Sequence, residues 1–218
     1  MGMAVFAEAF IEVTGLSRTE LSLAYMLGTI SSALFLTRAG RFYDEYGPRL
    51  VLVSASLLLG ASVVFISLVD VMSQSVTQSM GINAVGVAFC LMVVGYFGVR
   101  FSGQGVMTSA SRNMLLVWFE RKRGLVSGAR GVVVSLGFSL APLLLAVMID
   151  VWEWRAALWW LAVVVGPVFA VLCLLLVRDS PESCGLLADN QAPSTDVHEK
   201  NIAPRNFTLK EERANLAI

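Results

Sequence analysis

Arg100 is the residue whose surroundings point most directly to chemistry, because it is the only charged residue between Ala84 and Arg112. A charge at the centre of a membrane-spanning helix costs about 2.5–3.5 kcal/mol on insertion scales, so it normally faces a partner or a wet cavity. Gln104 follows one helical turn later. The fork of a guanidinium group matches a carboxylate bidentately. We therefore predict that Arg100 and Gln104 bind an anion or couple a proton; the alternative is an arginine paired to a neighbouring helix for structural reasons.

A second polar group lies between two apolar runs, in the segment GRFYDEYGPR. Gly40 and Gly47 allow two helices to approach each other through a tight turn, and Arg49 closes the segment. We expect Asp44 to pair with Arg112, at the end of the helix that carries Arg100, and so to act as a gate. The alternative is a capped, charged turn that only joins two helices.

A third segment, GFSLAP, contains Gly137 and Pro142. Glycine and proline bend a helix and let other helices pack against it. Gly124 and Gly128 precede them with a spacing that favours a second close helix contact. A simple packing kink would explain these residues equally well.

Long apolar runs must position all of these residues. Of the 218 residues, 56% are hydrophobic and only 15% are charged, whereas a soluble domain averages about 25% charged. The mean hydropathy is +0.73. Several apolar runs exceed the roughly 18 residues that mark a spanning helix. The composition therefore predicts an all-α, polytopic membrane protein, and a formal net charge of zero gives no reason to expect a nucleic-acid partner.

Catalytic and metal-binding patterns are missing from the apolar runs. The only histidine, His198, lies in a polar tail, and the three cysteines are not spaced for a disulfide framework or a zinc site. No HExxH motif or nucleophile elbow occurs. We expect neither an enzyme nor a protein that requires a metal or a cofactor.

The hydropathy pattern predicts five complete spans and one partial span. Residues 1–14 are too few to cross a hydrocarbon core about 30 Å thick. A capping box at Ser17 and Glu20 starts the next helix, a polar loop is expected over 70–83, and a short turn over 150–154. The transmembrane bundle covers 1–178 and a cytoplasmic polar linker or tail covers 179–218, with a short capped helix expected at 207–218. The spans are predicted at about 1–14 (partial), 18–38, 48–69, 84–117, 124–149 and 155–177.

Basic residues give the expected orientation. They concentrate in the connections 38–49 and 112–130 and in the tail, whereas the opposite side offers only Arg18 and Arg155 outside the helices. The positive-inside rule then places both connections and the tail in the cytoplasm. We expect a multi-pass protein of the cell membrane, in a bacterium the inner membrane.

The three polar segments resemble the motifs of the major facilitator superfamily, in the same order. The turn resembles motif A at Gly40, Asp44, Gly47 and Arg49 but departs from it at Glu45 and at the proline that follows Gly47. The segment RFSGQG resembles motif B, and GFSLAP resembles a degenerate motif C. The forms of motifs A and B are similar to those of the monocarboxylate and oxalate/formate antiporter-like branch, and the likeness covers nearly the whole chain.

The resemblance implies the amino-terminal six-helix half of a secondary transporter. In that family two six-helix bundles rock around a central site, which alternately opens to each side. The expected partners are the lipid bilayer, a small organic anion such as a mono- or dicarboxylate, and a coupled proton or counter-anion. Since no second bundle follows, the chain is predicted to be truncated at both ends or to assemble with a second half, and we favour the fragment. A non-transporting membrane scaffold is the alternative function.

Overall fold

The computed structural model describes residues 5–81, 83–119, 121–181 and 184–185, and every regular element among them is a helix. Most of the predicted tail, including His198 and the helix expected at 207–218, lies outside the described residues. The prediction of an all-α fold is confirmed. The elements are α1 (Ala7–Thr14), α2 (Arg18–Ser67), α3 (Val69–Met80), α4 (Ala84–Val99), the π-helix η2 (Arg100–Met107), α5 (Thr108–Trp118), α6 (Arg123–Val163), the π-helix η3 (Val164–Val168) and α7 (Phe169–Leu176).

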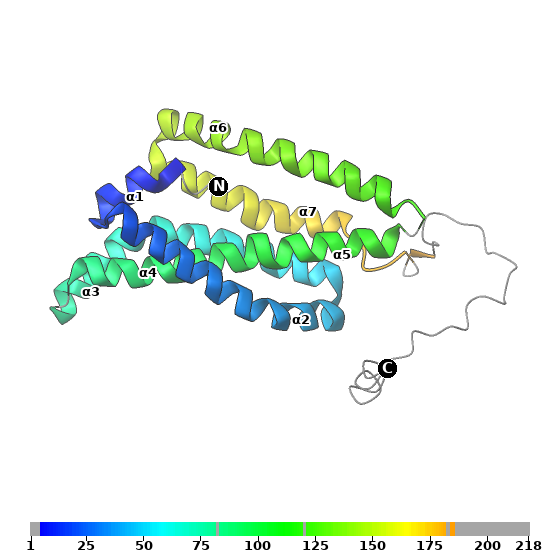
Figure 1. The fold of residues 1–218 in the computed structure, drawn as a ribbon, viewed down its shortest axis with the longest axis horizontal. Coiled ribbons are helices and arrows are strands. Elements are labelled where there is room, and N and C mark those ends of the chain that lie inside the picture. Colours follow the sequence, from blue (N-terminus) through cyan, green and yellow to red (C-terminus); the bar gives the residue numbers. More distant parts are fainter. Residues whose placement is uncertain (1–4, 82, 120, 182–183, 186–218) are drawn as a thin grey trace, which may run out of the picture.

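Three helical stretches of the described chain are long and apolar enough to cross a membrane: Arg18–Ser67, Ala84–Trp118 and Arg123–Leu176. The first and third each contain a residue with left-handed backbone geometry, Gly47 (φ 77°) and Glu153 (φ 64°). At each of these residues the chain turns back along itself (Figure 1). The middle stretch is helical throughout, from Ala84 to Trp118. The described chain therefore contains five long apolar segments.

The turn near Gly47 is tighter than the sequence suggested. The first segment of α2 does not end near Arg38 but remains helical up to Tyr46, so that Gly47 alone breaks the helical geometry. Pro48 then lies in the first turn of the second segment, where a missing N–H costs nothing.

The prediction of a polar loop over 70–83 is wrong for most of that range, because Val69–Met80 forms helix α3. Its hydroxyl groups donate back to helix carbonyls: Ser73 to Asp70 (2.9 Å), Ser75 to Val71 (2.9 Å) and Thr77 to Ser73 (2.8 Å). These bonds satisfy the hydrogen-bonding capacity of the polar side chains while the backbone stays helical. Gly81 (φ 66°) ends the helix, with its N–H donating to the carbonyl of Thr77.

The capping box at the start of α2 is confirmed. The backbone N–H of Glu20 donates to Ser17 Oγ (3.2 Å), and the backbone N–H of Ser17 donates to Glu20 Oε2 (2.8 Å). The adjacent helix α1 packs into the core through Phe10, whose ring meets that of Trp154 edge-on at 6.0 Å. Arg18 also pairs with Glu8 of α1. These contacts fix the short first helix at the end of the bundle.

One ionic and hydrogen-bonded cluster joins the end of α2 and the first turn of α3 to α6. Arg155 Nη2 lies 2.5 Å from Asp70 Oδ2, and the guanidinium lies over the ring of Trp154. The indole of Trp159 donates to Ser67 Oγ (3.0 Å). Ser67 is fully buried, so this bond satisfies a hydroxyl that water does not reach.

The second segment of α2 (48–67) lies closest to its neighbours at glycines. A β-carbon on Gly60 would lie 2.8 Å from Cα of Gly166 in η3, and one on Gly98 would lie 2.3 Å from Ser62 Oγ. In lipid the helices are not driven together by the hydrophobic effect, so such close backbone contacts supply much of the attraction between them.

We predict that Gly60→Ala destabilises the bundle whereas Gly86→Ala does not. The added methyl on Gly60 would overlap the backbone of Gly166, and overpacking costs about 1–3 kcal/mol, partly offset by about 1 kcal/mol of better helix propensity. Gly86 is the control because a β-carbon there meets nothing within 4 Å. The free energy of unfolding in detergent is the measurement, and equal stability of the two variants would contradict the packing argument.

Candidate functional site

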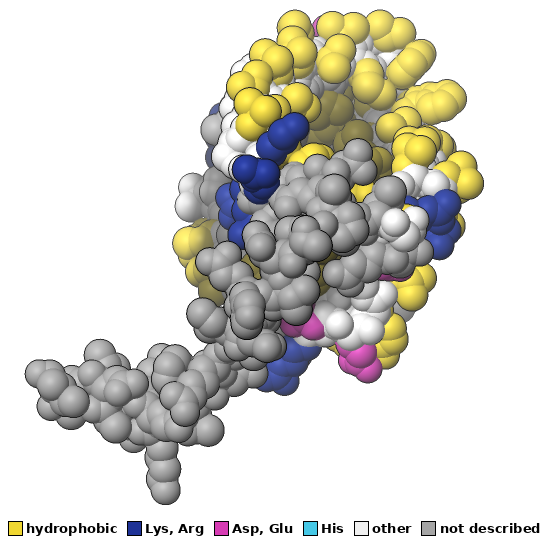
Figure 2. Space-filling model, turned by 90° about the vertical axis from the view of Figure 1, so that its right-hand side faces the viewer, with side chains coloured by type: hydrophobic (Ala, Val, Ile, Leu, Met, Phe, Trp, Pro, Cys, Tyr) yellow, Lys and Arg dark blue, Asp and Glu magenta, His cyan; other side chains and the backbone are white. Residues whose placement is uncertain are grey.

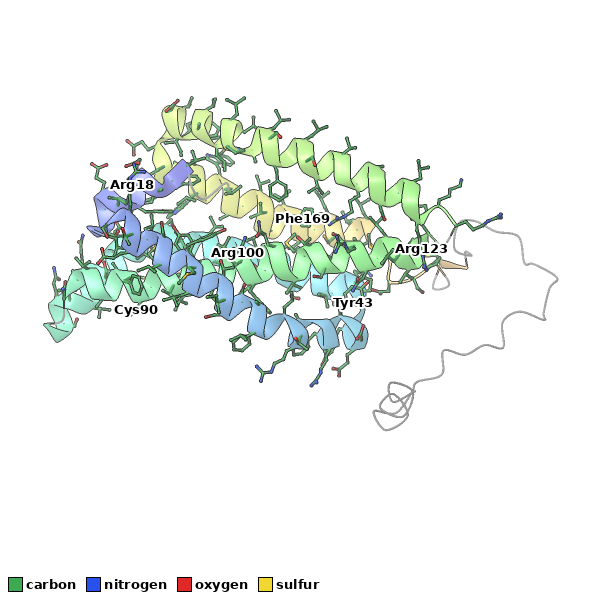
Figure 3. All side chains as sticks on the ribbon, in the orientation of Figure 1. Arg18, Tyr43, Cys90, Arg100, Arg123 and Phe169 are labelled. Carbon is green, nitrogen blue, oxygen red and sulfur yellow. The ribbon has the colours of Figure 1, made fainter. Side chains whose placement is uncertain are left out.

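Arg100 is the first residue of the π-helix η2 (Arg100–Met107) in the middle stretch. A π-helical segment widens the helix by one residue per turn and frequently marks a functional site. Two hydroxyl groups bond back to carbonyls in this region: Thr108 Oγ1 donates to the carbonyl of Gly103, five residues back (3.2 Å), and Ser102 Oγ donates to the carbonyl of Gly98 (2.6 Å). Figure 3 shows Arg100 about midway along the helices.

The guanidinium of Arg100 is held by the first segment of α2. Its Nε donates to Thr29 Oγ1 (3.1 Å), and its Cζ lies 5.2 Å from the centre of the Tyr25 ring. Tyr25 meets Tyr96 edge-on at 5.3 Å, which holds the first ring in place. The ion pairs among the described residues are Arg18–Glu8 and Arg155–Asp70, so no described carboxylate compensates the charge of Arg100.

Arg100 and Gln104 line the same cavity, of about 230 Å³. The structure thus brings together the two residues predicted to bind an anion. Arg100 is half-buried and Gln104 is exposed. An arginine and an amide in a mostly apolar cavity can bind an anionic group more strongly than the same groups in water. The remaining lining comes from Tyr25, Leu59, Val63, Tyr96, Val99, Gly103, Phe138, Leu145, Leu161 and Val165.

Tyr25 and Thr29 are site residues that our sequence analysis missed. They lie four residues apart on the 18–38 run, which places both on one helix face. Two polar side chains on one face of an apolar span were the sequence feature that could have identified Tyr25 and Thr29 as site residues. Among the described residues, no group of three His, Cys, Asp or Glu side chains could hold a metal ion.

The residues predicted to form a gate do not all come together. The ion pairs of the described residues include none between Asp44 and Arg112, and Asp44 is exposed. Gly40 has open space where a β-carbon would lie. The expected pair is therefore not formed in this conformation.

Arg49 and Gly47 instead meet the carboxyl end of α7. The guanidinium of Arg49 donates to the carbonyl of Leu174 (2.5 Å), and its backbone N–H donates to Asp179 Oδ1 (3.1 Å). A β-carbon on Gly47 would lie 2.8 Å from the same carboxylate oxygen. A cation therefore lies at the carboxyl end of one helix and an anion at the amino end of another, and each arrangement is favourable with respect to the helix dipole. Asp179 was assigned to the linker from the sequence, so this contact was missed.

The glycines of α6 that were predicted to allow close helix packing have open space around them in the described part of the chain. β-carbons on Gly124, Gly128 and Gly137 would meet nothing within 4 Å. Pro142 lies within α6, which continues as a helix on both sides of it. Neither Gly137 nor Pro142 lines the cavity around Arg100, although Phe138 does.

We predict that Asp179→Ala loosens the start of the second segment of α2. Loss of a capping side chain costs about 0.5–2 kcal/mol, which corresponds to about 2- to 30-fold faster opening of the first helical turn. Hydrogen exchange of the amides of residues 49–51 measures this opening. Asp44→Ala is the matched control and should leave the exchange rates of these amides unchanged. An equal increase in both variants would show that the loss of a negative charge, and not the loss of the cap, speeds the opening.

The family model of the Major Facilitator Superfamily matches residues 1–209. The chain is also similar to a glycerol-3-phosphate transporter of Bacillus subtilis (strain 168), at 26% identity over 185 residues, which cover 83% of this chain and 38% of that protein. The chain thus spans well under half the length of this relative, and no solved structure matches it significantly. The expectation that the chain is not an enzyme agrees with these matches, and so does a polytopic membrane fold. By its family match and its apolar helices, the chain belongs to the Major Facilitator Superfamily of membrane transporters.

Proposed function

We propose that this chain is the substrate-binding amino-terminal bundle of a secondary transporter for a small organic anion. The observation that carries the proposal is the shared cavity of Arg100 and Gln104, in which the guanidinium has no carboxylate partner among the described residues. A charge that is half-buried in an apolar bundle favours a ligand of opposite sign. Alternating access would then carry the bound anion, with a coupled proton or in exchange for a counter-anion, across the cell membrane.

Two classes of anion fit this cavity. A guanidinium binds carboxylates and phosphates through the same parallel N–H···O bonds, so the cavity does not by itself distinguish them. Mono- and dicarboxylates are favoured by the resemblance of the RFSGQG and GPR segments to those of the monocarboxylate and oxalate/formate antiporter-like branch. An organic phosphate is favoured by the similarity to a glycerol-3-phosphate transporter. Both classes therefore belong in one panel of test ligands.

A non-transporting scaffold, or an inactive half-transporter, is the second candidate function. It is favoured by α6, on which all residues from 131 to 140 are exposed. Much of α6 also lies apart from the other helices (Figure 1). In a complete carrier a second bundle closes the pathway, and among the described residues this face of α6 is left uncovered.

The proposal is tested by comparing Arg100→Gln with the unchanged chain, each purified and reconstituted in proteoliposomes. We expect binding of the preferred anion to fall about 10- to 100-fold, because a hydrogen bond to a charged group contributes about 1.5–3 kcal/mol. Arg100→Lys keeps the positive charge but loses the bidentate guanidinium, so its affinity for the anion should lie between those of the unchanged chain and Arg100→Gln. Binding is measured by equilibrium dialysis with radiolabelled glycerol 3-phosphate, lactate and oxalate, and uptake with the same ligands.

Lys122→Gln is the control, since it removes a charge that lies outside the cavity. If Arg100→Gln retained binding and uptake of every anion that the unchanged chain accepts, the proposed site would be wrong. Anion binding that depends on Arg100, without uptake, would favour the inactive half-transporter. The absence of binding by the unchanged chain would favour the scaffold.

We also propose that the connections 38–49 and 112–130 and the tail face the cytoplasm. Lys and Arg side chains are spread around the end of the molecule at which these connections lie (Figure 2), in accord with the positive-inside rule. In a chain whose three cysteines are replaced, Lys122→Cys should react with an impermeant maleimide only in inverted vesicles. Ser75→Cys, at the opposite end, should react in intact cells. The reverse pattern would overturn the orientation.

A further inference from the structure

A second cavity, of about 570 Å³, lies on the other side of η2 from the anion-binding cavity. Both segments of α2 form its walls, and Phe101, Ser102 and Val106 of η2 form its floor. Its volume falls within the range of about 300–1,000 Å³ that is typical of small-molecule sites. The two segments of α2 contribute Phe35, Arg38, Ala39, Phe42, Tyr46, Leu50, Val51, Val53, Ser54, Ala55, Leu57 and Leu58. We call it the α2 groove.

Arg38 is the only charged side chain among the described residues that line the α2 groove. Its guanidinium lies over the ring of Phe35, at 5.3 Å from the centroid, and the ion pairs of the described residues do not include it. The groove's two serine hydroxyls already donate to carbonyls of their own helices, Ser54 to Val51 and Ser102 to Gly98. The groove therefore presents one cation on an otherwise mostly apolar surface, to which Tyr46 adds a phenol ring.

The length of the α2 groove matches one leaflet of a bilayer. From the turn at Gly47 to Leu58 the second segment of α2 advances by about 16 Å at 1.5 Å per residue, which is about half of a hydrocarbon core of roughly 30 Å. Leu58 and Phe101 line the groove far from the turn, while Phe42 and Tyr46 stack at 6.0 Å close to it. Tyrosine side chains favour the membrane–water interface, and Tyr46 lies beside the turn, so we expect the groove to run from the interface towards the bilayer centre.

We infer that the α2 groove binds an anionic phospholipid, with an acyl chain on the apolar walls and the phosphate at Arg38. A lipid phosphate supplies the charge partner that the described residues do not give Arg38. A protein helix that covered the groove would have to bury this guanidinium or provide a carboxylate for it. Asp44 and Glu45 follow on the next turns, but neither lines the groove. The inference concerns a different cavity from the proposed transport site and does not depend on it.

Native mass spectrometry of the full chain, released from detergent with equimolar phosphatidylglycerol and phosphatidylcholine, tests the inference. We expect the unchanged chain to retain phosphatidylglycerol preferentially. Arg38→Gln should weaken this retention about five-fold, as expected for one arginine near a lipid surface. Arg41→Gln is the matched control, because it removes an equally exposed charge three residues away that does not line the groove. It should change retention less than two-fold.

A second pair of variants tests the groove itself. Ser54→Phe fills the space at an exposed wall position and should abolish retention, while Ser54→Ala should preserve it. Equal retention of the two lipids, or equal losses in Arg38→Gln and Arg41→Gln, would overturn the inference. So would a dimer mass that disappears in Ser54→Phe without any lipid adduct, because the groove would then be a contact between copies of the chain.

Discussion

The close approach of the second segment of α2 to its neighbours is the constraint on which the rest of this structure depends. At Gly60 and Gly166 two backbones come so near that a β-carbon on Gly60 would lie 2.8 Å from Cα of Gly166, and a β-carbon on Gly98 would overlap the side chain of Ser62. In lipid, helix association depends on such contacts because apolar side chains gain little by leaving the hydrocarbon. Arg100 lies two residues beyond Gly98, so the depth and direction of its side chain follow from this packing.

Arg100 shows how a bundle built from apolar packing can still hold a charge. The guanidinium donates to Thr29, lies over the ring of Tyr25 and lines a cavity. These contacts reduce the cost of placing the charge in the membrane without neutralising it. A carboxylate on a neighbouring helix would stabilise the bundle further but would compete with any anionic ligand. Neutral partners therefore leave the cation available.

The sequence predicted the helices well and their ends less well, for identifiable reasons. Apolar runs determine which segments lie in lipid, so the all-α fold followed from hydropathy. Hydropathy does not show whether a polar segment is helical, and α3 forms because its hydroxyls bond to carbonyls of its own backbone. Arg100 and Gln104 share a cavity because they lie one turn apart. The contact of Arg49 with Asp179 was not predictable, because residues 130 positions apart carry no local signal of their pairing.

The two cavities beside η2 differ in the polarity of their linings although each has one arginine. Around Arg100, Gln104 and the ring hydroxyl of Tyr25 add polar groups to a cavity of about 230 Å³, which suits a small polar anion. Around Arg38 the walls are almost wholly apolar, the cavity is larger, and the serine hydroxyls are already bonded. Under both proposals the same guanidinium chemistry would bind a small anion in the cavity on one side of η2 and a lipid phosphate in the groove on the other. Both arginines offer an anion the same N–H donors. The difference between the two proposed ligands therefore rests on the size and polarity of the cavity walls.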